Sequence, residues 1–242
     1  MRVSRLYTEL PVTGRAQLTL TGTPANHISR VLRLRAGDAL VLFDGTGGEY
    51  PATIEGFGRD AVHLALGPHR AAERESPLAI TLLQGISRGE RMDFVVQKAT
   101  ELGVARIIPV LAERTVVKLD AAQASSRVRH WRAVAVAACE QCGRNRLPEL
   151  AQPLSLPALL AQLPPGQPRL LLAPGGTLKV RDLAPTTALT VLIGPEGGLS
   201  ETEESRALRA GFQALVLGPR ILRTETAALA ALAVLQERLG DL

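Results

Sequence analysis

The sequence predicts an α/β fold in which a mainly parallel sheet follows a small β-barrel. Strand-like and helix-like runs alternate from Leu78 onwards, and this alternation is typical of parallel sheets covered on both faces. In the last quarter of the chain, the apolar runs 188–193 and 214–217 each end in a glycine turn that opens a helix. The barrel is indicated by short strand-like runs separated by turns within residues 1–70.

The first domain is predicted to comprise residues 1–72. Its expected strands lie at 17–20, 39–43, 50–54 and 61–66. Asp44-Gly45 and Gly47-Gly48 favour turns between them, and residues 23–34 are expected to form one helix that carries His27, Arg30 and Arg33. The polar segment from 67 to 77 is typical of a linker.

The second domain is predicted to comprise residues 73–242. Its expected strands lie at 78–84, 104–111, 169–172, 188–193 and 214–217, and its helices at 90–102, 121–142, 156–163, after Ser200 and at 226–239. The helix at 90–102 places Met92, Val95, Val96, Ala99 and Leu102 on one face. Ser200 and Glu203 have the spacing of a capping box.

The two glycine turns are candidates for ligand contact, because loops at the carboxyl ends of parallel strands bind ligands in α/β sheets. A glycine lets the backbone approach a ligand closely. The turn GPEGG at 194–198 is not G-x-G-x-x-G, and no Gly-Lys-Ser/Thr follows either turn. A nicotinamide-dependent oxidoreductase and a nucleoside triphosphatase are therefore poor candidates.

The charge of the chain favours a polyanionic partner. The formal net charge is +5, and only three of the 28 basic residues are lysine. The positive excess lies in residues 76–150, and arginine clusters occur at 2 and 5, at 30, 33 and 35, at 127, 129 and 132, and at 144 and 146. With seven aromatic residues, nucleic-acid contact should depend on arginine and backbone rather than on base stacking.

Neither a metal centre nor a membrane segment is expected. Cys139 and Cys142 lie at the end of a helical run without a second cysteine pair, and the four histidines have no ligand spacing. The first residues contain no apolar signal core, and the longest apolar run, 227–235, is too short to span a bilayer. We therefore expect a cytoplasmic protein.

Five motifs together give the chain a specific resemblance to a known family. They are SRGERMD at 87–93, QKATELG at 97–103, ACEQCGRNR at 138–146, LIGPEGGLS at 192–200 and LGPRILRTET at 217–226. The chain resembles the RsmE-type 16S ribosomal RNA (uracil-N3)-methyltransferases of the SPOUT superfamily. The similarity extends over nearly the whole chain, including residues 2–7 and 26–33.

The resemblance implies a PUA-like β-barrel that binds RNA and a SPOUT-type parallel sheet with a C-terminal trefoil knot. It also implies a homodimer that acts on one uridine of 16S rRNA, in the decoding region of the small (30S) subunit, with S-adenosylmethionine as cofactor. Three knot loops would hold this cofactor, at 172–176, 193–199 and 217–226. The residues implied for cofactor binding are Leu172, Ala173, Gly175, Ile193, Gly194, Gly197, Leu217, Gly218, Ile221, Leu222, Thr224 and Thr226.

The charged residues of these loops are the candidates for catalysis. Methyl transfer to uracil N3 needs an aligned nucleophile and removal of the N3 proton. We expect Arg223 to contact the uracil or its phosphate and Glu225 to act as base or orienting group, with Glu196 behind them. A helix-terminal role for Glu225 and an ion pair for Arg223 remain alternatives.

RNA contact is expected from basic residues in both domains, namely Arg5, Arg30, Arg33, Arg88, Arg144 and Arg146. Two other functions remain open. A SPOUT ribose 2'-O-methyltransferase would share the cofactor loops and differ in the methylated atom. A non-catalytic RNA-binding assembly factor would keep the fold without turnover, although the intact glycines and charged loop residues argue against it.

Overall fold

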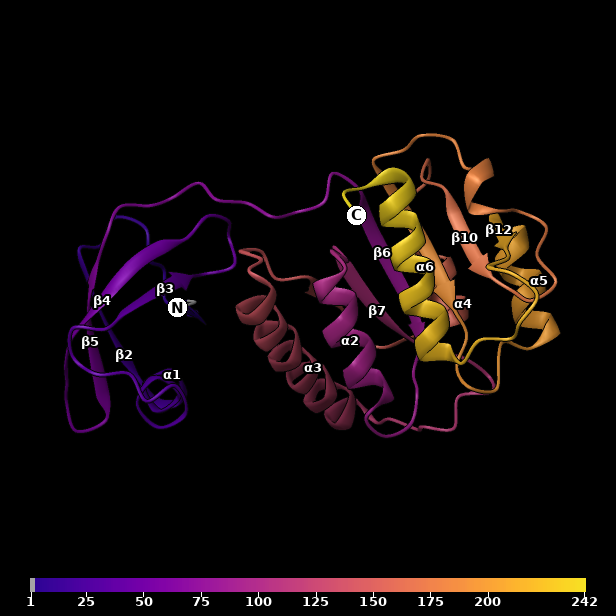
Figure 1. The fold of residues 1–242 in the computed structure, drawn as a ribbon. Helices are drawn as coiled ribbons and strands as arrows, with labels where there is room; N and C mark the ends of the chain where they lie inside the picture. Colours follow the sequence, from indigo (N-terminus) through magenta and orange to yellow (C-terminus); the bar gives the residue numbers. More distant parts are fainter. Residues whose placement is uncertain (1–2) are drawn as a thin grey trace. The chain divides into compact units, whose positions relative to one another are not determined.

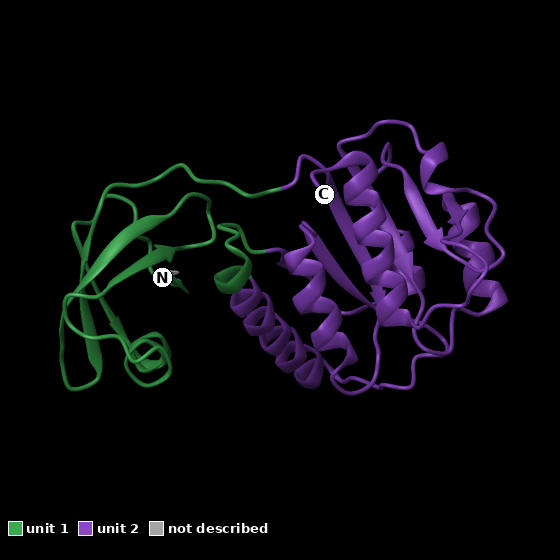
Figure 2. Ribbon diagram, viewed as in Figure 1, with its two compact units in different colours: residues 1–75, 139–147 green, residues 76–138, 148–242 purple. Residues whose placement is uncertain are grey.

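The computed structural model describes residues 3–242, and Arg2 lies outside the described residues. The chain divides into two compact units (Figure 2). Unit 1 comprises the residues up to Glu75 together with Cys139–Leu147, and unit 2 comprises Ser76–Ala138 and Pro148–Leu242. The segment Cys139–Leu147 therefore belongs to unit 1, whereas the sequence places it inside the second domain.

Unit 1 is built on a curled five-stranded sheet with the strand order β1-β3-β4-β5-β2 (Figure 1). Its strands are β1 (Ser4–Tyr7), β2 (Gln17–Thr21), β3 (Ala39–Phe43), β4 (Tyr50–Phe57) and β5 (Ala61–Leu66). β1 pairs in parallel with β3, and the other neighbours pair antiparallel. Since β1 and β2 form the two edges, the structure has a curled sheet where the sequence predicts a barrel. The strand β1 is absent from the sequence prediction.

The predicted helix at 23–34 is shorter and irregular in the structure. α1 (Gly22–Asn26) continues directly into the π-helical turn η1 (His27–Val31). Arg33 then adopts a φ of 54°, which lies in the left-handed region that a right-handed helix does not contain. This backbone conformation explains why the helical segment stops before residue 34.

An ion pair of Arg144 and a hydrogen bond to Asn145 attach the segment Cys139–Leu147 to the rest of unit 1. Arg5 donates hydrogen bonds to the carboxylate of Glu49, at 2.5 Å, and to the side-chain oxygen of Asn145. Arg144 is 4% exposed and forms two bonds with the carboxylate of Glu75, at 2.6 and 3.0 Å. A buried charge that loses its partner is costly, so the pair of Arg144 with Glu75 fixes the position of the segment.

The cysteines of this segment are free. Burial raises the pKa of the Cys139 thiol to about 12. The thiol therefore stays protonated near neutral pH and is a poor nucleophile and a poor metal ligand. Among residues 3–242, no group of three or more His, Cys, Asp and Glu side chains is arranged to hold a metal ion.

Unit 2 contains a parallel sheet with the order β12-β10-β11-β6-β7-β8, and β9 also pairs with β7. The strands are β6 (Ala79–Gly85), β7 (Arg106–Leu111), β8 (Glu149–Leu150), β9 (Leu154–Ser155), β10 (Arg169–Leu172), β11 (Ala188–Ile193) and β12 (Phe212–Leu215). Every pairing is parallel. The loops that follow β6, β10, β11 and β12 consequently lie at one edge of the sheet.

Helices cover both faces of this sheet (Figure 1). They are α2 (Arg91–Glu101), α3 (Ala121–Cys142), α4 (Leu156–Leu160), the short 3₁₀ helix η2 (Val180–Asp182), α5 (Glu201–Arg209) and α6 (Thr224–Leu239). The last four residues of α3, from Cys139, belong to unit 1. α2 and α6 pack on one face together with Trp131 of α3, and α4 and α5 pack on the other. In the described part of the chain, no helix is both long and apolar enough to cross a membrane.

Several local predictions for unit 2 are confirmed. The predicted face of α2 buries Met92, Val95, Val96 and Ala99. The capping box that begins α5 forms, with Ser200 accepting from the Glu203 amide and Glu203 accepting from the Ser200 amide. The predicted strand 188–193 coincides with β11.

Other boundaries differ from the predictions. The strand predicted at 214–217 is Phe212–Leu215 in the structure. Leu178 pairs with Leu215 in an isolated bridge, and the amide of Val216 donates to the carbonyl of Leu178 at 3.0 Å. The chain after Leu215 therefore turns to a partner outside the sheet. The predicted helix 156–163 ends at Leu160.

Candidate functional site

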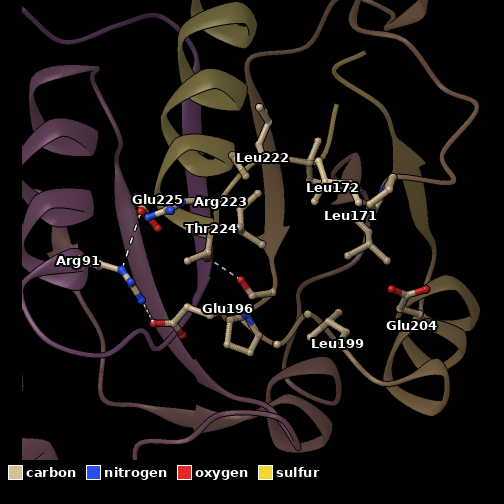
Figure 3. A pocket seen from close by; sticks show the side chains of 18 residues that line it. Arg91, Leu171, Leu172, Glu196, Leu199, Glu204, Leu222, Arg223, Thr224 and Glu225 are labelled. Carbon is tan, nitrogen blue, oxygen red and sulfur yellow. Dashed lines mark hydrogen bonds and ion pairs between the residues drawn. The ribbon is translucent and has the colours of Figure 1, made fainter. Parts of the chain in front are cut away.

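A cavity of about 460 Å³ lies at the carboxyl ends of the unit 2 strands (Figure 3). The segments that form it follow β10 and β11 and precede α6, and Arg91 of α2 lies at its rim. Its lining residues are Arg91, Leu171, Leu172, Pro174, Ile193, Gly194, Pro195, Glu196, Gly197, Gly198, Leu199, Glu204, Ile221, Leu222, Arg223, Thr224, Glu225 and Ala227. Its volume is in the range of small-molecule and cofactor sites.

The inner part of the cavity is apolar. Leu171, Leu172, Leu199 and Leu222 present their side chains there, as Figure 3 shows. The turn after β11 contributes backbone amide and carbonyl groups beside these side chains. A flat apolar group with polar edges could be held between such surfaces.

Gly85 allows two of the loops to approach each other closely. A Cβ atom at this position would collide with the backbone of Gly194 and Pro195. Gly194 in turn lies close to the backbone of Leu199, where an added Cβ would come within 3.1 Å of the amide nitrogen. Sequence reasoning did not select Gly85, although a glycine at the end of a buried strand is a recognisable sign of close backbone approach.

Thr224 links the start of α6 to the turn after β11. Its hydroxyl donates to the carbonyl of Gly194 at 2.6 Å and accepts a bond of 3.0 Å from the side-chain amide of Gln84. Gln84 is fully buried at the end of β6 and also donates to the carbonyl of Gly85 at 3.1 Å. The hydroxyl of Thr224 thus joins two loops. Sequence reasoning missed Gln84, a polar residue at the end of an apolar strand.

Two carboxylates and one guanidinium form an ionic cluster at the mouth of the cavity (Figure 3). Arg91 Nη1 lies 2.8 Å from Glu196 Oε1, and Arg91 Nε lies 3.9 Å from Glu225 Oε1. Glu196 also accepts a hydrogen bond of 2.9 Å from the backbone amide of Arg88. Arg91 belongs to the motif at 87–93, but its contact with both carboxylates could not be read from spacing.

The pKa of Glu196 lies below its usual value. Partial burial acts to raise the pKa, but the hydrogen bond from the Arg88 amide and the ion pair with Arg91 outweigh it. Glu196 is therefore ionised at neutral pH and already accepts hydrogen bonds from the Arg88 amide and the Arg91 guanidinium. Such a carboxylate is better suited to positioning Arg91 than to accepting a proton.

Arg223 and Glu225 both line the cavity at the start of α6. Arg223 is the N-cap residue, and its carbonyl accepts from the amide of Ala227 at 2.7 Å. Its side chain is exposed and makes no hydrogen bond or ion pair with other residues in the range 3–242. The guanidinium is thus free to meet a ligand, while the side chain of Glu225 is only 16% exposed.

The cavity contains part of the predicted cofactor-binding set. Leu172, Ile193, Gly194, Gly197, Ile221, Leu222 and Thr224 line it. A smaller cavity of about 80 Å³ shares several of these residues and adds Ala173, Leu217 and Gly218. Gly175 and Thr226 line neither cavity. Leu171 and Glu204 line the main cavity without having been selected from the sequence, and Leu199 lines it as the last residue of the predicted loop 193–199.

The predicted RNA-binding arginines fall into two groups. Arg5 and Arg144 are engaged in the buried ion pairs of unit 1, so their guanidinium groups have a structural role there. The exposed arginines are Arg30, Arg33 and Arg146 in unit 1 and Arg88 in unit 2. Arg146 lies 3.6 Å from Glu73 but remains 52% exposed.

Two family models match the chain. Residues 74–236 match an RNA methyltransferase domain, and residues 20–66 match an RNA methyltransferase PUA domain. The first match covers most of unit 2 and the second covers most of the curled sheet of unit 1.

Relatives of known name cover the whole chain. A ribosomal RNA small subunit methyltransferase E from Buchnera aphidicola is 31% identical over 100% of this chain and 98% of its own length. The structure of a methyltransferase from Legionella pneumophila, in complex with the cofactor SAM, is 40% identical with a TM-score of 0.96 over 100% of both chains. A ribosomal RNA small subunit methyltransferase E from Neisseria gonorrhoeae, bound to S-adenosyl methionine, is 38% identical with a TM-score of 0.94 over 99% of both chains.

Proposed function

Because the chain belongs to the ribosomal RNA small subunit methyltransferase E family, we propose that it methylates N3 of one uridine in 16S rRNA. The cofactor is S-adenosylmethionine, which the related Neisseria and Legionella proteins bind. The observation that carries the proposal is the cavity at the carboxyl edge of the sheet, where glycine turns and apolar side chains meet a cluster of ionisable groups.

The residues of the cavity fit this cofactor. The leucine side chains and the backbone of the turn after β11 suit an adenosyl group, which is flat and has hydrogen-bonding edges. The close contact of Gly85 with Gly194 and Pro195 keeps the turn in place. When bound, S-adenosylmethionine supplies an activated methyl group. The residues proposed to hold it are Leu172, Ala173, Gly175, Ile193, Gly194, Gly197, Leu217, Gly218, Ile221, Leu222, Thr224 and Thr226.

Glu225 is the proposed acceptor of the N3 proton. It lies at the mouth of the cavity, and its distance of 3.9 Å from Arg91 leaves it less tightly engaged than Glu196. The N3 proton would pass to the Glu225 carboxylate, and the N3 electron pair would form the bond to the methyl carbon while the bond between that carbon and the cofactor sulfur breaks, its electron pair remaining on the sulfur. Glu196, which already accepts from Arg88 and Arg91, is proposed to hold Arg91 in place.

Arg223 is the proposed partner of the uridine. Loss of the N3 proton spreads negative charge over the two flanking carbonyl oxygens of uracil, and a guanidinium can stabilise that charge or the adjacent phosphate. Arg223 is exposed at the cavity, and its guanidinium is not engaged by the other residues in the range 3–242.

RNA affinity is proposed to come from the exposed arginines of both units, namely Arg30, Arg33, Arg88 and Arg146. The PUA domain match in unit 1 supports a role of this unit in RNA binding. Arg5 and Arg144 are left out of the proposal, because Glu49 and Glu75 already neutralise them.

Three further properties follow from family membership as proposals. We propose that the loops around the cavity form a trefoil knot, that the protein acts as a homodimer, and that it meets 16S rRNA or the 30S subunit in the cytoplasm. The topology is compatible with a knot, because β12 lies at the edge of the sheet beyond β10 while the following helix α6 packs on α2, β6 and β11.

Mass mapping of 16S rRNA nucleosides tests the function. Cells that lack the gene should lose one N3-methyluridine, and the wild-type gene should restore it. Restoration should fail with Glu225→Gln. Unchanged N3-methyluridine in the deletion strain would reject the assignment, and loss of a ribose-methylated nucleoside instead would identify a 2'-O-methyltransferase.

A further inference from the structure

Unit 1 contains a second cavity, of about 450 Å³, that the proposed methyl transfer does not use. Its wall is formed by three loops of the curled sheet and by Tyr50 of β4. The lining residues are Thr13, Gly14, Arg15, Thr46, Gly47, Tyr50, Gly67, Pro68 and His69. All of them belong to unit 1.

An aromatic pair stands on one side of this cavity. The rings of Tyr50 and His69 lie with their centroids 5.0 Å apart and are inclined by 49°. Tyr50 is buried and exchanges a hydrogen bond of 2.9 Å with the hydroxyl of Thr13, whereas His69 is exposed. A side chain at Gly48 would collide with the imidazole. The site therefore has a supported tyrosine and an imidazole that solvent, or a ligand, can reach.

One cationic side chain lines the cavity. Arg15 lines it, is exposed and makes no side-chain hydrogen bond or ion pair within residues 3–242. The guanidinium of Arg146 and the carboxylate of Glu73 both lie against Gly47, where an added Cβ would collide with either of them. Glu73 lies 3.6 Å from Arg146 and also accepts a hydrogen bond of 2.6 Å from the Gly48 amide, so it offsets the charge of Arg146. Among the described residues that line the cavity, none is an aspartate or glutamate, and Arg15 keeps an unpaired guanidinium. Such a site favours an anion over a cation.

We propose that this cavity binds one nucleotide of a single-stranded segment of the RNA substrate. Arg15 contacts a phosphate, as expected for a chain that relies on arginine, and the exposed imidazole of His69, which is not among the seven Phe, Tyr and Trp residues, adds a single stacking contact with a base. The proposal rests on the proposed function, because it takes the substrate to be RNA. The proposed contact involves residues of unit 1 only, and none of them lines the methyl transfer cavity.

Binding of a fluorescein-labelled, mixed-sequence RNA decamer to the full chain tests the proposal. The variants are Arg15→Gln and His69→Ala. Their matched controls are Arg59→Gln, an exposed arginine in the turn between β4 and β5, and His63→Ala, an exposed histidine on β5. Neither control residue lines the cavity.

We expect each cavity variant to weaken binding of the decamer by about tenfold and each control by less than about twofold. Arg15→Gln should also reduce the slope of log affinity against log salt by about 0.7, the loss of one phosphate contact. Affinity for S-adenosylmethionine, measured by calorimetry, should stay unchanged in all four variants, because the two cavities share no residue.

Wild-type affinity and salt slope in both cavity variants would overturn the proposal, as would equal losses in the controls. Mapping of the methylated nucleoside answers a separate question. A protein that makes N3-methyluridine but binds RNA equally well without Arg15 and His69 would keep the proposed function and lose this inference.

Discussion

Replacing Thr224 by valine removes one hydroxyl and keeps nearly the same volume. Thr224 is 7% exposed, and its hydroxyl makes two bonds, to the Gly194 carbonyl and from the Gln84 amide. Each such bond contributes about 1 kcal/mol to stability. Gln84 keeps its second bond to Gly85, and Gly194 is half-buried, so the groups left behind are not both isolated. We therefore expect the free energy of unfolding to fall by about 2 kcal/mol.

The same substitution should also weaken binding of the cofactor. The lost hydrogen bond joins the start of α6 to the Gly194 turn, and both segments line the cavity. Without this bond, the two segments are no longer held in fixed positions relative to each other. We expect affinity for S-adenosylmethionine to fall by about tenfold, which corresponds to about 1.4 kcal/mol. Thr224→Ser keeps the hydroxyl and should recover most of the affinity.

Urea unfolding followed by tryptophan fluorescence is a suitable assay. Trp131 is the only tryptophan, is 2% exposed and lies in unit 2, so it reports on the unit that contains the cavity. Thr226→Val is the matched control, since Thr226 is exposed on the same helix and makes no side-chain hydrogen bond within residues 3–242. It should change stability by less than about 0.5 kcal/mol. Equal unfolding midpoints for the two valine variants would refute the reasoning.

Three more predictions concern the ionisable groups. Glu196 has a lowered pKa in the folded protein, so its stabilising contribution is present above its unfolded value of 4.5 and is lost as the pH falls through the folded value. The stability difference between wild type and Arg91→Gln should accordingly shrink between about pH 6 and about pH 3 in urea titrations, and a constant difference would contradict the ion pair. Glu225→Gln should lower kcat for methyl transfer by about 10²-fold or more while leaving calorimetric affinity for S-adenosylmethionine within about twofold; unchanged kcat would remove Glu225 as the base. Arg144→Ala should destabilise unit 1 by about 3 kcal/mol or more in thermal unfolding, because the Glu75 carboxylate loses its partner. Arg146→Ala removes an exposed ion pair and should cost less than about 1 kcal/mol in that assay. Equal losses of stability in the two variants would show that the burial of Arg144 does not make its ion pair more important than that of Arg146.

The local pattern of the chain predicted much of the α/β unit. Apolar runs bounded by glycine located β11, and the Ser200 and Glu203 spacing located the start of α5. These features depend on residues a few positions apart, so the local sequence is enough to predict them. The end of β12 was misplaced because Val216 bonds to the carbonyl of Leu178, a partner distant in sequence.

Contacts between residues distant in sequence also explain why the site was predicted only in part. Arg144 and Arg146 are equivalent in a charge count, yet Arg144 meets Glu75, which lies 69 positions earlier, and becomes buried. The loops of the cavity could be proposed from the motifs, but the link from Gln84 through Thr224 to Gly194 exists only once the strands are placed in order. Arg91 could be read as part of a motif, while its position between Glu196 and Glu225 required the fold.

A crystal structure grown with excess S-adenosylmethionine tests the central claim most directly. We predict density for the adenosyl group between the Gly194 turn and the segment before α6, with the methyl carbon facing Arg223 and Glu225. The cofactor bound at another place, with this cavity filled only by solvent, would contradict the account.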